Sequence, residues 1–564
     1  MPFYIWSALF VTVIFFVISQ LRPSGYFWMI DEGGKYTYML SVIENKDPSG
    51  PIIYPYRQYD PKAQFPPFFH RIQIGDQFFT WWQPGLALLT IPFFMLFGSA
   101  GIYLLPAIGG GITAGFSGAI AARLCKEHRW VPLFVTLVVA FATPIAFYSQ
   151  MFWEHTISSA FLMANLYLLL MPEEDERSTT IFVAGFLGAW AVFFRAESIL
   201  IVAGFLIALL FYKKKKAIYY GAGFALGMIL AVSLSYNLSG TFLNPNLSIV
   251  LQSQPLGVLK EKFFLGYFLY NHPSMYALPI PENQLFWGVL FFFATIIFAL
   301  HPKTRWISAV SGLGVALIAV FVLFSPVGYR AVHGFLTIAP HVIFSAWYFS
   351  RRESWQASIM PALLSGSLLV FMFVYLYKSW AAAGGLQWGP RYLLPFYPML
   401  VIVAVVALAR EFQNISKYPF MRLLITGIYI FSILVGFGFS IRGFINVNRL
   451  EKYAYQTESY MTTFDDMPVL LGCDINALIP NIYWDQPVFS ILQSDMAQWI
   501  DNAIQTNISQ FYRLRFDLCF LNNIDEIAAY RISNPSGIEA EICSVAQYIR
   551  DSDNYCQPVP ALAP

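Results

Sequence analysis

Two adjacent carboxylates, Asp31 and Glu32, follow shortly after the first apolar run of the chain, which ends near Leu21. A carboxylate at the boundary between an apolar layer and water is partly desolvated, which raises its pKa and lets it accept a proton near neutral pH. The pair could therefore provide a general base. The alternative is structural, because an Asp often caps the helix that follows it, here with Gly33-Gly34 as the turn.

Three short polar segments between later apolar runs also carry ionisable side chains. They read Phe152-Trp153-Glu154-His155, Phe194-Arg195-Ala196-Glu197 and Gly384-Gly385-Leu386-Gln387-Trp388-Gly389-Pro390-Arg391-Tyr392. Charged groups at the ends of apolar helices are costly to bury alone, so they usually face a polar cavity or pair with one another. Arg195 could simply bridge to Glu154 or Glu197 and hold helices together. Because all these clusters are expected on one side of the apolar layer, we favour one shared cavity.

The segment 23–83 is long, rich in Pro, Tyr and Phe, and carries scattered basic residues, namely Arg57, Lys62, His70 and Arg71. Such a surface could hold a lipid-linked phosphate while its aromatic rings stay in the headgroup layer of a membrane. An ordinary aromatic belt would explain the rings equally well. It would not explain the length of the segment.

Other chemistries have little support in the sequence. The histidines His128, His301, His333 and His341 show no metal-ligand spacing. His155 beside Glu154 could bind a divalent metal, but adjacent positions on a helix point in different directions. No Ser-His-Asp arrangement, C-x-x-C pair, phosphate-binding loop or dinucleotide fingerprint is found. We therefore predict no metal site and no required cofactor, and an ATP-driven pump is disfavoured.

The composition decides what kind of protein must position these groups. Of the 564 residues, 57% are hydrophobic, 18% aromatic and only 12% charged, whereas soluble proteins carry about 25% charged residues. The apolar residues come in runs of about 16–24, the pattern of membrane-spanning helices. This excludes a soluble enzyme, a nucleic-acid-binding protein, a fibrous protein and a disordered chain. The net charge of +2 indicates no strongly charged macromolecular partner.

The apolar runs predict about thirteen membrane crossings. They are 3–22, 101–124, 130–149, 155–171, 178–194, 197–212, 217–238, 285–301, 306–325, 331–350, 356–377, 391–410 and 421–441. A shorter run, 84–99, is expected to be a juxtamembrane or half-inserted helix. The short loops on one side of the membrane hold about fifteen cations, and those on the other side hold about four. This asymmetry places the N-terminus in the cytoplasm, and the membrane is expected to be the cell or inner membrane. The loop 23–83 with its juxtamembrane helices, the loop 239–284 and the tail 442–564 would then face outward.

The tail 442–564 has globular composition and predicts a small extracytoplasmic α/β domain. Four of the five cysteines lie in it, namely Cys473, Cys519, Cys543 and Cys556. An even set fits a disulfide-permissive compartment, with the pairing open and four free thiols as the alternative. The predicted fold is thus a mainly α polytopic bundle, residues 1–441, followed by this domain.

The order of several motifs carries a resemblance. A single helix is followed by Asp31-Glu32, and a long loop closes on Trp81-Trp82-Gln83-Pro84-Gly85. Arg195-Ala196-Glu197 comes later, and Gly389-Pro390-Arg391-Tyr392-Leu393-Leu394-Pro395 lies near the last helices. Across nearly all of 1–441 this order resembles the GT-C class of integral-membrane glycosyltransferases. Within that class the chain is most similar to the protein O-mannosyltransferase and lipid A aminoarabinose transferase group.

The resemblance implies an enzyme that transfers a sugar from a polyprenyl- or dolichyl-phosphate carrier to an acceptor lipid, glycan or protein on the outer face. Asp31 would be the catalytic base, with Glu32 beside it and Glu154 as the acidic position of the second outer loop. This chain departs from the group in two places, since the group often has Asp where Glu154-His155 stands, and some members have Pro-Pro-Leu where Gln83-Pro84-Gly85 stands.

Further site residues are expected on the same grounds. The phosphate of the donor would be bound by basic side chains of the outer loops, namely Arg391, Arg195, Lys260, Arg57 and Lys62. Contacts with the substrates are expected from His155, Glu197, Tyr392, Gln387 and Trp388. The expected partners are the lipid-linked sugar, its acceptor and membrane lipids, and no nucleic acid.

Two other functions fit parts of the sequence. A secondary transporter or lipid flippase would use the same charged residues as a permeation path, but it should show two similar halves and charges near helix midpoints. A membrane receptor that binds its ligand with residues 442–564 would leave the Asp31-Glu32 pair and the long first loop without a purpose. We therefore favour the glycosyltransferase.

Overall fold

A computed structural model describes residues 3–67, 71–171, 177–239, 282–324, 333–378, 388–414, 418–462, 464, 467–471, 479–490, 496–516, 538–546 and 556–558. The chain divides into two compact units. The helical unit comprises Met1–Ser19, Gly101–Tyr236 and Phe242–Ile445, and the mixed unit comprises Gln20–Ala100, Asn237–Thr241 and Asn446–Pro564. Each unit is described separately below.

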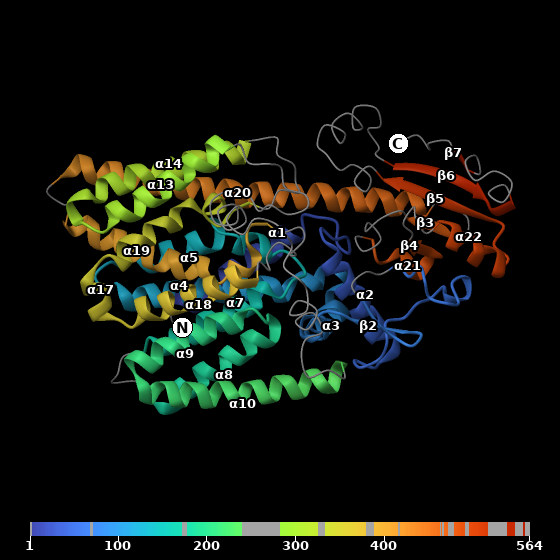
Figure 1. The fold of residues 1–564 in the computed structure, drawn as a ribbon, viewed down its shortest axis with the longest axis horizontal. Coiled ribbons are helices and arrows are strands. Elements are labelled where there is room, and N and C mark those ends of the chain that lie inside the picture. The colour runs from blue at the N-terminus through green and yellow to red at the C-terminus, as the bar shows by residue number, and fades with distance from the viewer. Residues whose placement is uncertain are drawn as a thin grey trace. The chain divides into compact units, whose positions relative to one another are not determined.

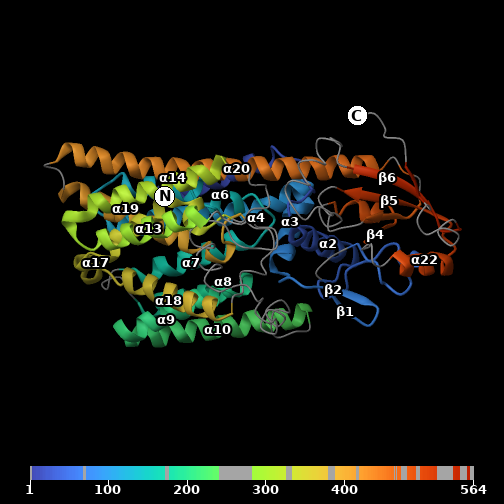
Figure 2. The ribbon, with the colours of Figure 1, turned by 45° about the horizontal axis from the view of Figure 1, so that its top comes forward.

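The helical unit consists mainly of apolar helices (Figures 1 and 2). They are α1 (Phe3–Ser19), α4 (Leu104–Leu124), α5 (Val131–Phe141), α6 (Ile145–Tyr148), α7 (His155–Leu169), α8 (Ser178–Phe194), α9 (Ser198–Tyr212), α10 (Lys214–Ser239), α13 (Glu282–Ala299), α14 (Arg305–Phe324), α15 (Phe335–Ile338), α16 (Ala346–Phe349), α17 (Arg352–Ala357), α18 (Met360–Lys378), α19 (Phe396–Asn414) and the first part of α20 (Pro419–Met461). Most of the predicted spans coincide with one of these helices to within a few residues.

Within the described residues, five helical segments are long and apolar enough to cross a membrane. They are Gly85–Leu124, Lys214–Leu238, Pro302–Phe324, Phe396–Gln413 and Pro419–Met461. Shorter apolar helices of 10–17 residues accompany them. Large apolar side chains such as Phe211, Leu369 and Phe373 are 70–81% exposed, as expected where a helix faces lipid rather than water. The protein is a multi-pass membrane protein, while the number of thirteen crossings stays a prediction.

Helix α4 packs against α1, α5 and α7 through its glycines. A Cβ on Gly109 would lie 2.7 Å from the backbone nitrogen of Ile157 in α7. A Cβ on Gly115 would lie 2.8 Å from the backbone oxygen of Tyr4 in α1. The backbones therefore approach directly, which is how helices associate in a membrane, where burial away from water cannot drive them together.

Two of the predicted spans are not single helices in the structure. Span 130–149 is divided into α5 and α6, and span 331–350 is described from residue 333 as α15, a 3₁₀ turn (Pro340–Ser345) and α16. Pro144 and Pro340 are the cause, because proline lacks an amide hydrogen and disfavours the helical conformation of the residue before it. Ala339, which precedes Pro340, has φ −145° and ψ 69°.

The helix that contains the predicted last span, 421–441, continues to Met461. Between Phe444 and Met461 the sequence has neither glycine nor proline, so nothing local ends the helix at the predicted position. Helix α20 belongs to the helical unit up to Ile445 and to the mixed unit beyond it. The predicted domain boundary at 441/442 thus falls inside a helix.

The mixed unit combines the segment after α1 with the C-terminal part of the chain. Its first part holds α2 (Ile30–Asn45), a 3₁₀ turn (Arg57–Tyr59), the antiparallel hairpin β1 (Arg71–Ile74) and β2 (Gln77–Thr80), and α3 (Gly85–Phe97). Its second part holds β3 (Val469–Leu471), α21 (Ile482–Asp485), β4 (Val488–Ser490), α22 (Met496–Gln505), β5 (Gln510–Phe516), β6 (Ile538–Ser544) and β7 (Cys556–Pro558). The strands form a sheet in the order β4-β3-β5-β6-β7, parallel on both sides of β3 and antiparallel beyond β5.

The two parts of the mixed unit share a hydrophobic core. The ring of Phe65 lies 5.4 Å from that of Trp499 in α22, and its carbonyl accepts the backbone N–H of Ser490 at 3.1 Å. Buried Asp60 shapes this turn, because its carboxylate accepts the N–H of Phe65 at 2.7 Å and the hydroxyl of Tyr54 at 2.9 Å. The long first loop is therefore packed into the same core as the tail.

Two further links tie the mixed unit together. Cys543 is disulfide-bonded, whereas Cys125 of the helical unit is free and buried. Arg22 Nη1 lies 2.8 Å from Glu451 Oε1 of α20, and both side chains are 1% exposed. Removing one partner of such a pair leaves a buried charge uncompensated, so the pair fixes the chain before α2 to the helix before the sheet.

Candidate functional site

Three of the polar segments that the sequence singles out meet in the helical unit. Glu154 immediately precedes α7, Arg195 and Glu197 connect α8 to α9, and Arg391 and Tyr392 begin a 3₁₀ turn that leads into α19. Gly389 allows the chain to turn just before Arg391, because its φ of 70° lies in the left-handed region that favours glycine.

Arg195 is held between two carboxylates. Its Nη1 lies 2.9 Å from Glu154 Oε1, its Nη2 lies 2.6 Å from Glu197 Oε1, and its Nε donates to the same Glu197 oxygen at 2.7 Å. These are the bridges that were the structural alternative for this cluster. They join α7 to the α8–α9 connection, and the planar guanidinium donates to both carboxylates at once.

Arg391 brings a second guanidinium to the same place. Its Cζ lies 5.2 Å from the ring centre of Trp153 and 5.4 Å from that of Tyr392. Arg195 approaches the same Tyr392 ring, at 5.8 Å. Two positive charges around one aromatic ring repel each other, so the arrangement favours the presence of negative charge nearby.

The electrostatics of Arg195 reflect these neighbours. Burial by itself lowers the pKa of its guanidinium, whereas the carboxylates of Glu197 and Glu154 raise it, and Arg391 lowers it again. The net result is a pKa above the ordinary value. Arg195 is therefore charged at every pH at which the protein is folded.

A stack of aromatic rings supports the charged groups. The ring of Tyr148 stacks on Trp153 at 5.3 Å and on His155 at 5.0 Å. The hydroxyl of Tyr148 accepts the backbone N–H of Trp388 at 3.2 Å, and the Trp388 ring stacks on Phe147 at 5.5 Å. His155 and Trp388, which the sequence predicts as substrate contacts, are thus buried in the aromatic packing beneath the charged cluster.

Sequence reasoning missed Tyr148 and gave Trp153 no role. Trp153 could have been found, because it adjoins Glu154 and His155 in the same segment. Tyr148 has no sequence signal, since a tyrosine near the end of an apolar run is ordinary. Within the described residues, no three His, Cys, Asp or Glu side chains come close enough together to hold a metal ion.

Asp31 and Glu32 lie in the mixed unit, in the first turn of α2. Glu32 is fully buried and accepts the backbone N–H of Trp28 at 3.2 Å and of Met29 at 3.1 Å, so it secures the start of the helix. The structural alternative, with Asp31 as the cap and Gly33-Gly34 as a turn, is wrong, because the helix begins at Ile30 and both glycines lie inside it. Asp31 is half-buried beside this cap.

The remaining predicted residues are spread more widely. Arg57 of the mixed unit is bound to Asp76, its Nη2 lying 3.1 Å from Asp76 Oδ2, and Lys62 is exposed. Lys260 and Gln387 lie outside the described residues. The structure therefore brings together Glu154, His155, Arg195, Glu197, Trp388, Arg391 and Tyr392 in one unit.

Solved structures provide the comparisons with known proteins. ArnT from Cupriavidus metallidurans bound to undecaprenyl phosphate is similar with a TM-score of 0.43 and 16% identity, covering 91% of this chain and 92% of that one. A structure of the same protein in the apo state is similar with a TM-score of 0.40 and 15% identity, covering 91% and 93%. The archaeal oligosaccharyltransferase AglB from Archaeoglobus fulgidus, in complex with an inhibitory peptide and a dolichol phosphate, has a TM-score of 0.46 and 14% identity, covering 90% and 69%.

No protein-family model matches the chain, and no curated protein sequence matches it. The similarity to the solved structures assigns neither an activity nor a residue to this protein. The resemblance to the lipid A aminoarabinose transferase group, which the order of the motifs suggests, is found again among these structures.

Proposed function

We propose that this protein is a glycosyltransferase that moves a sugar from a polyprenyl-phosphate donor to an acceptor on the extracytoplasmic face of the membrane. The observation that carries the proposal is the pair of guanidiniums, Arg195 and Arg391, that flank the ring of Tyr392 at 5.8 and 5.4 Å beside two carboxylates. Charged groups at helix ends in a membrane protein pair with one another, as Arg195 does, or face a charged ligand, which is the role proposed for Arg391.

The donor supplies that charge. In the reaction, the bond between the sugar C1 and the phosphate oxygen breaks, a bond from C1 to the acceptor hydroxyl oxygen forms, and the acceptor proton passes to a base. Negative charge grows on the departing lipid phosphate, and fixed cations that face it lower the barrier. Arg391 is proposed to contact this phosphate, with Arg195 beside it.

The roles of the carboxylates follow from their partners. Glu154 and Glu197 bind Arg195 and position it, and Glu32 caps α2. Asp31, the carboxylate that the resemblance implies as the base, is proposed as the proton acceptor. Undecaprenyl phosphate and dolichol phosphate are the lipids named with two of the similar solved structures, and the same class of lipid is proposed here as the carrier of the donor sugar. The proposed reaction uses no metal, so EDTA should leave its rate unchanged.

The test supplies the purified protein, in liposomes with membrane extract as the source of acceptor, with lipid-phosphate sugars in turn. The release of polyprenyl phosphate is measured. Asp31→Asn should lower the rate by about 100-fold or more, because its amide cannot accept the proton. Asp47→Asn, at an exposed aspartate just after α2, is the matched control and should keep the wild-type rate.

Two results would contradict the proposal. Full activity of Asp31→Asn would remove that residue as the base. Uptake or flipping of a lipid across the liposome membrane, with no lipid-linked sugar consumed, would favour the transporter instead.

A further inference from the structure

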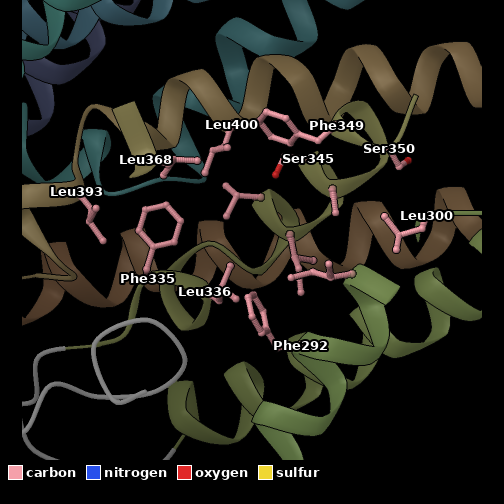
Figure 3. A pocket seen from close by; sticks show the side chains of 14 residues that line it. Phe292, Leu300, Phe335, Leu336, Ser345, Phe349, Ser350, Leu368, Leu393 and Leu400 are labelled. Carbon is pink, nitrogen blue, oxygen red and sulfur yellow. The ribbon is translucent and has the colours of Figure 1, made fainter. Parts of the chain in front are cut away.

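An apolar cavity of about 360 Å³ lies in the helical unit (Figure 3). Phe292 of α13, Leu300 just after α13, Phe335 and Leu336 of α15, and Leu368 of α18 point into it. Of its 14 lining residues only Ser345 and Ser350 are polar. Its volume falls in the range of about 300–1,000 Å³ that is usual for ligand sites.

The cavity exists because one wall is not a continuous helix. The wall consists of α15, the 3₁₀ turn Pro340–Ser345 and α16, which Pro340 interrupts. A cavity with such a lining does not attract water, because water would find almost no hydrogen-bond partners in it. In a bilayer the available filling is hydrocarbon, which regains the dispersion contacts that an empty space forfeits.

One end of the cavity lies beside a buried cluster of charges. Leu300 and Ser350 lie at the same end in Figure 3, and Ser350 directly precedes Arg351. Arg305 Nη1 lies 2.6 Å from Glu411 Oε2, and Arg351 Nη2 contacts the same oxygen. Two guanidiniums thus share one carboxylate, and within the described residues the Nε atoms of both arginines have no hydrogen-bond partner.

The rim at this end is also basic and aromatic. The segments 301–305, 351–355 and 410–411 hold five Lys or Arg and two Glu, an excess of three positive charges. Lys303 and Arg352 are exposed there, and so are the rings of Trp306, 44% exposed, and Trp355, 39% exposed. Basic residues with tryptophans beside them are typical of the level of lipid headgroups, and clusters of basic residues there attract anionic lipids.

We propose that this cavity binds one acyl chain of an anionic phospholipid, whose phosphate lies against the cationic rim formed by Lys303, Arg352 and the Arg305–Glu411–Arg351 cluster. The apolar lining favours the acyl chain, and the excess positive charge favours an anionic over a zwitterionic headgroup. Binding of an anionic lipid at this rim requires no transfer reaction, so it can be measured without any transfer assay.

The first part of the test concerns the acyl chain and compares two substitutions on one helix. Leu368 lines the cavity, whereas its neighbour Leu369 is 70% exposed. The full-length protein is reconstituted in phosphatidylcholine with a trace of spin-labelled phosphatidylglycerol, and motionally restricted lipid is measured. Leu368→Trp should fill the cavity and release about one restricted phosphatidylglycerol per protein, whereas Leu369→Trp should release none.

The second part of the test concerns the positive charge of the rim and compares two double variants. Lys303→Gln with Arg352→Gln should lower the preference for phosphatidylglycerol over phosphatidylcholine by roughly fivefold for each cation removed. Lys214→Gln with Lys215→Gln removes two exposed cations at the start of α10 and should leave it unchanged. The proposal is overturned if the wild type shows no such preference, if Leu368→Trp and Leu369→Trp behave alike, or if polyprenyl phosphate displaces the spin-labelled lipid.

Discussion

At the scale of residues, the types and spacing of charged side chains indicated which groups would meet and that Arg195 could pair with Glu154 or Glu197, but not that it binds both carboxylates at once. Glu154, Arg195, Glu197 and Arg391 could be selected because charge is rare and costly beside apolar runs. Arg195 can bind both carboxylates because of the angle between α7 and the α8–α9 connection. The local sequence does not determine this angle. Glu32 shows the same limit, since its capping role depends on where α2 begins.

The first prediction concerns the unequal roles in this bridge. Arg195→Gln removes the cation that Glu154 and Glu197 both bind and should lower the free energy of unfolding by about 3 kcal/mol, at the low end for buried pairs because Arg195 is 15% exposed. Glu154→Gln leaves Arg195 its second partner and should cost about 1 kcal/mol. Thermal unfolding in detergent measures both. Equal losses would mean that Glu197 does not compensate Arg195.

At the scale of elements, hydrophobic runs predicted where the helices lie but not where they break. Pro144 and Pro340 were visible in the sequence, yet the length of each apolar run outweighed them, because proline is also tolerated within continuous membrane helices. The glycines of α4 were equally visible, but their helix partners were not. Which of them permit a close approach is decided by the helices that face them.

The second prediction tests that close approach. Gly109→Ala should lower the melting temperature of the protein, because its new Cβ would lie 2.7 Å from the backbone of α7, which cannot yield as a flexible side chain can. Gly221→Ala in α10 is the control, since nothing lies within 4 Å of its added Cβ. It should be neutral or stabilising, as alanine is the better helix former. Equal melting temperatures would show that α4 and α7 are not in contact through Gly109.

At the scale of the whole molecule, the sequence predicted a membrane bundle and a globular tail, but not that the long first loop joins the tail. The contacts that unite them are remote in sequence. The Nδ2 of Asn502 donates to the carbonyl of Tyr59, 443 residues away, at 2.6 Å. Neither composition nor periodicity predicts such pairings. The boundary between the two units could not be predicted either, because it falls inside the continuous helix α20.

The third prediction concerns this shared core. Phe65→Ala removes a ring that is 3% exposed and packs against Trp499, so it should destabilise the mixed unit by about 3–5 kcal/mol. Limited proteolysis should then cleave the C-terminal part faster than in the wild type. Ile74→Ala, at a side chain 62% exposed in β1, should not change the cleavage rate. Unchanged cleavage of Phe65→Ala would show that the loop does not support the tail.

The central claim is that Arg391 and Arg195 face a lipid phosphate in a sugar-transfer reaction. The most direct measurement is the rate of polyprenyl-phosphate release from a lipid-linked sugar by Arg391→Gln, with the exposed Arg129→Gln as the control. Arg391→Gln should lose about 100-fold or more in rate, Arg391→Lys should recover part of it, and Arg129→Gln should match the wild type. A wild-type rate for Arg391→Gln would contradict the claim.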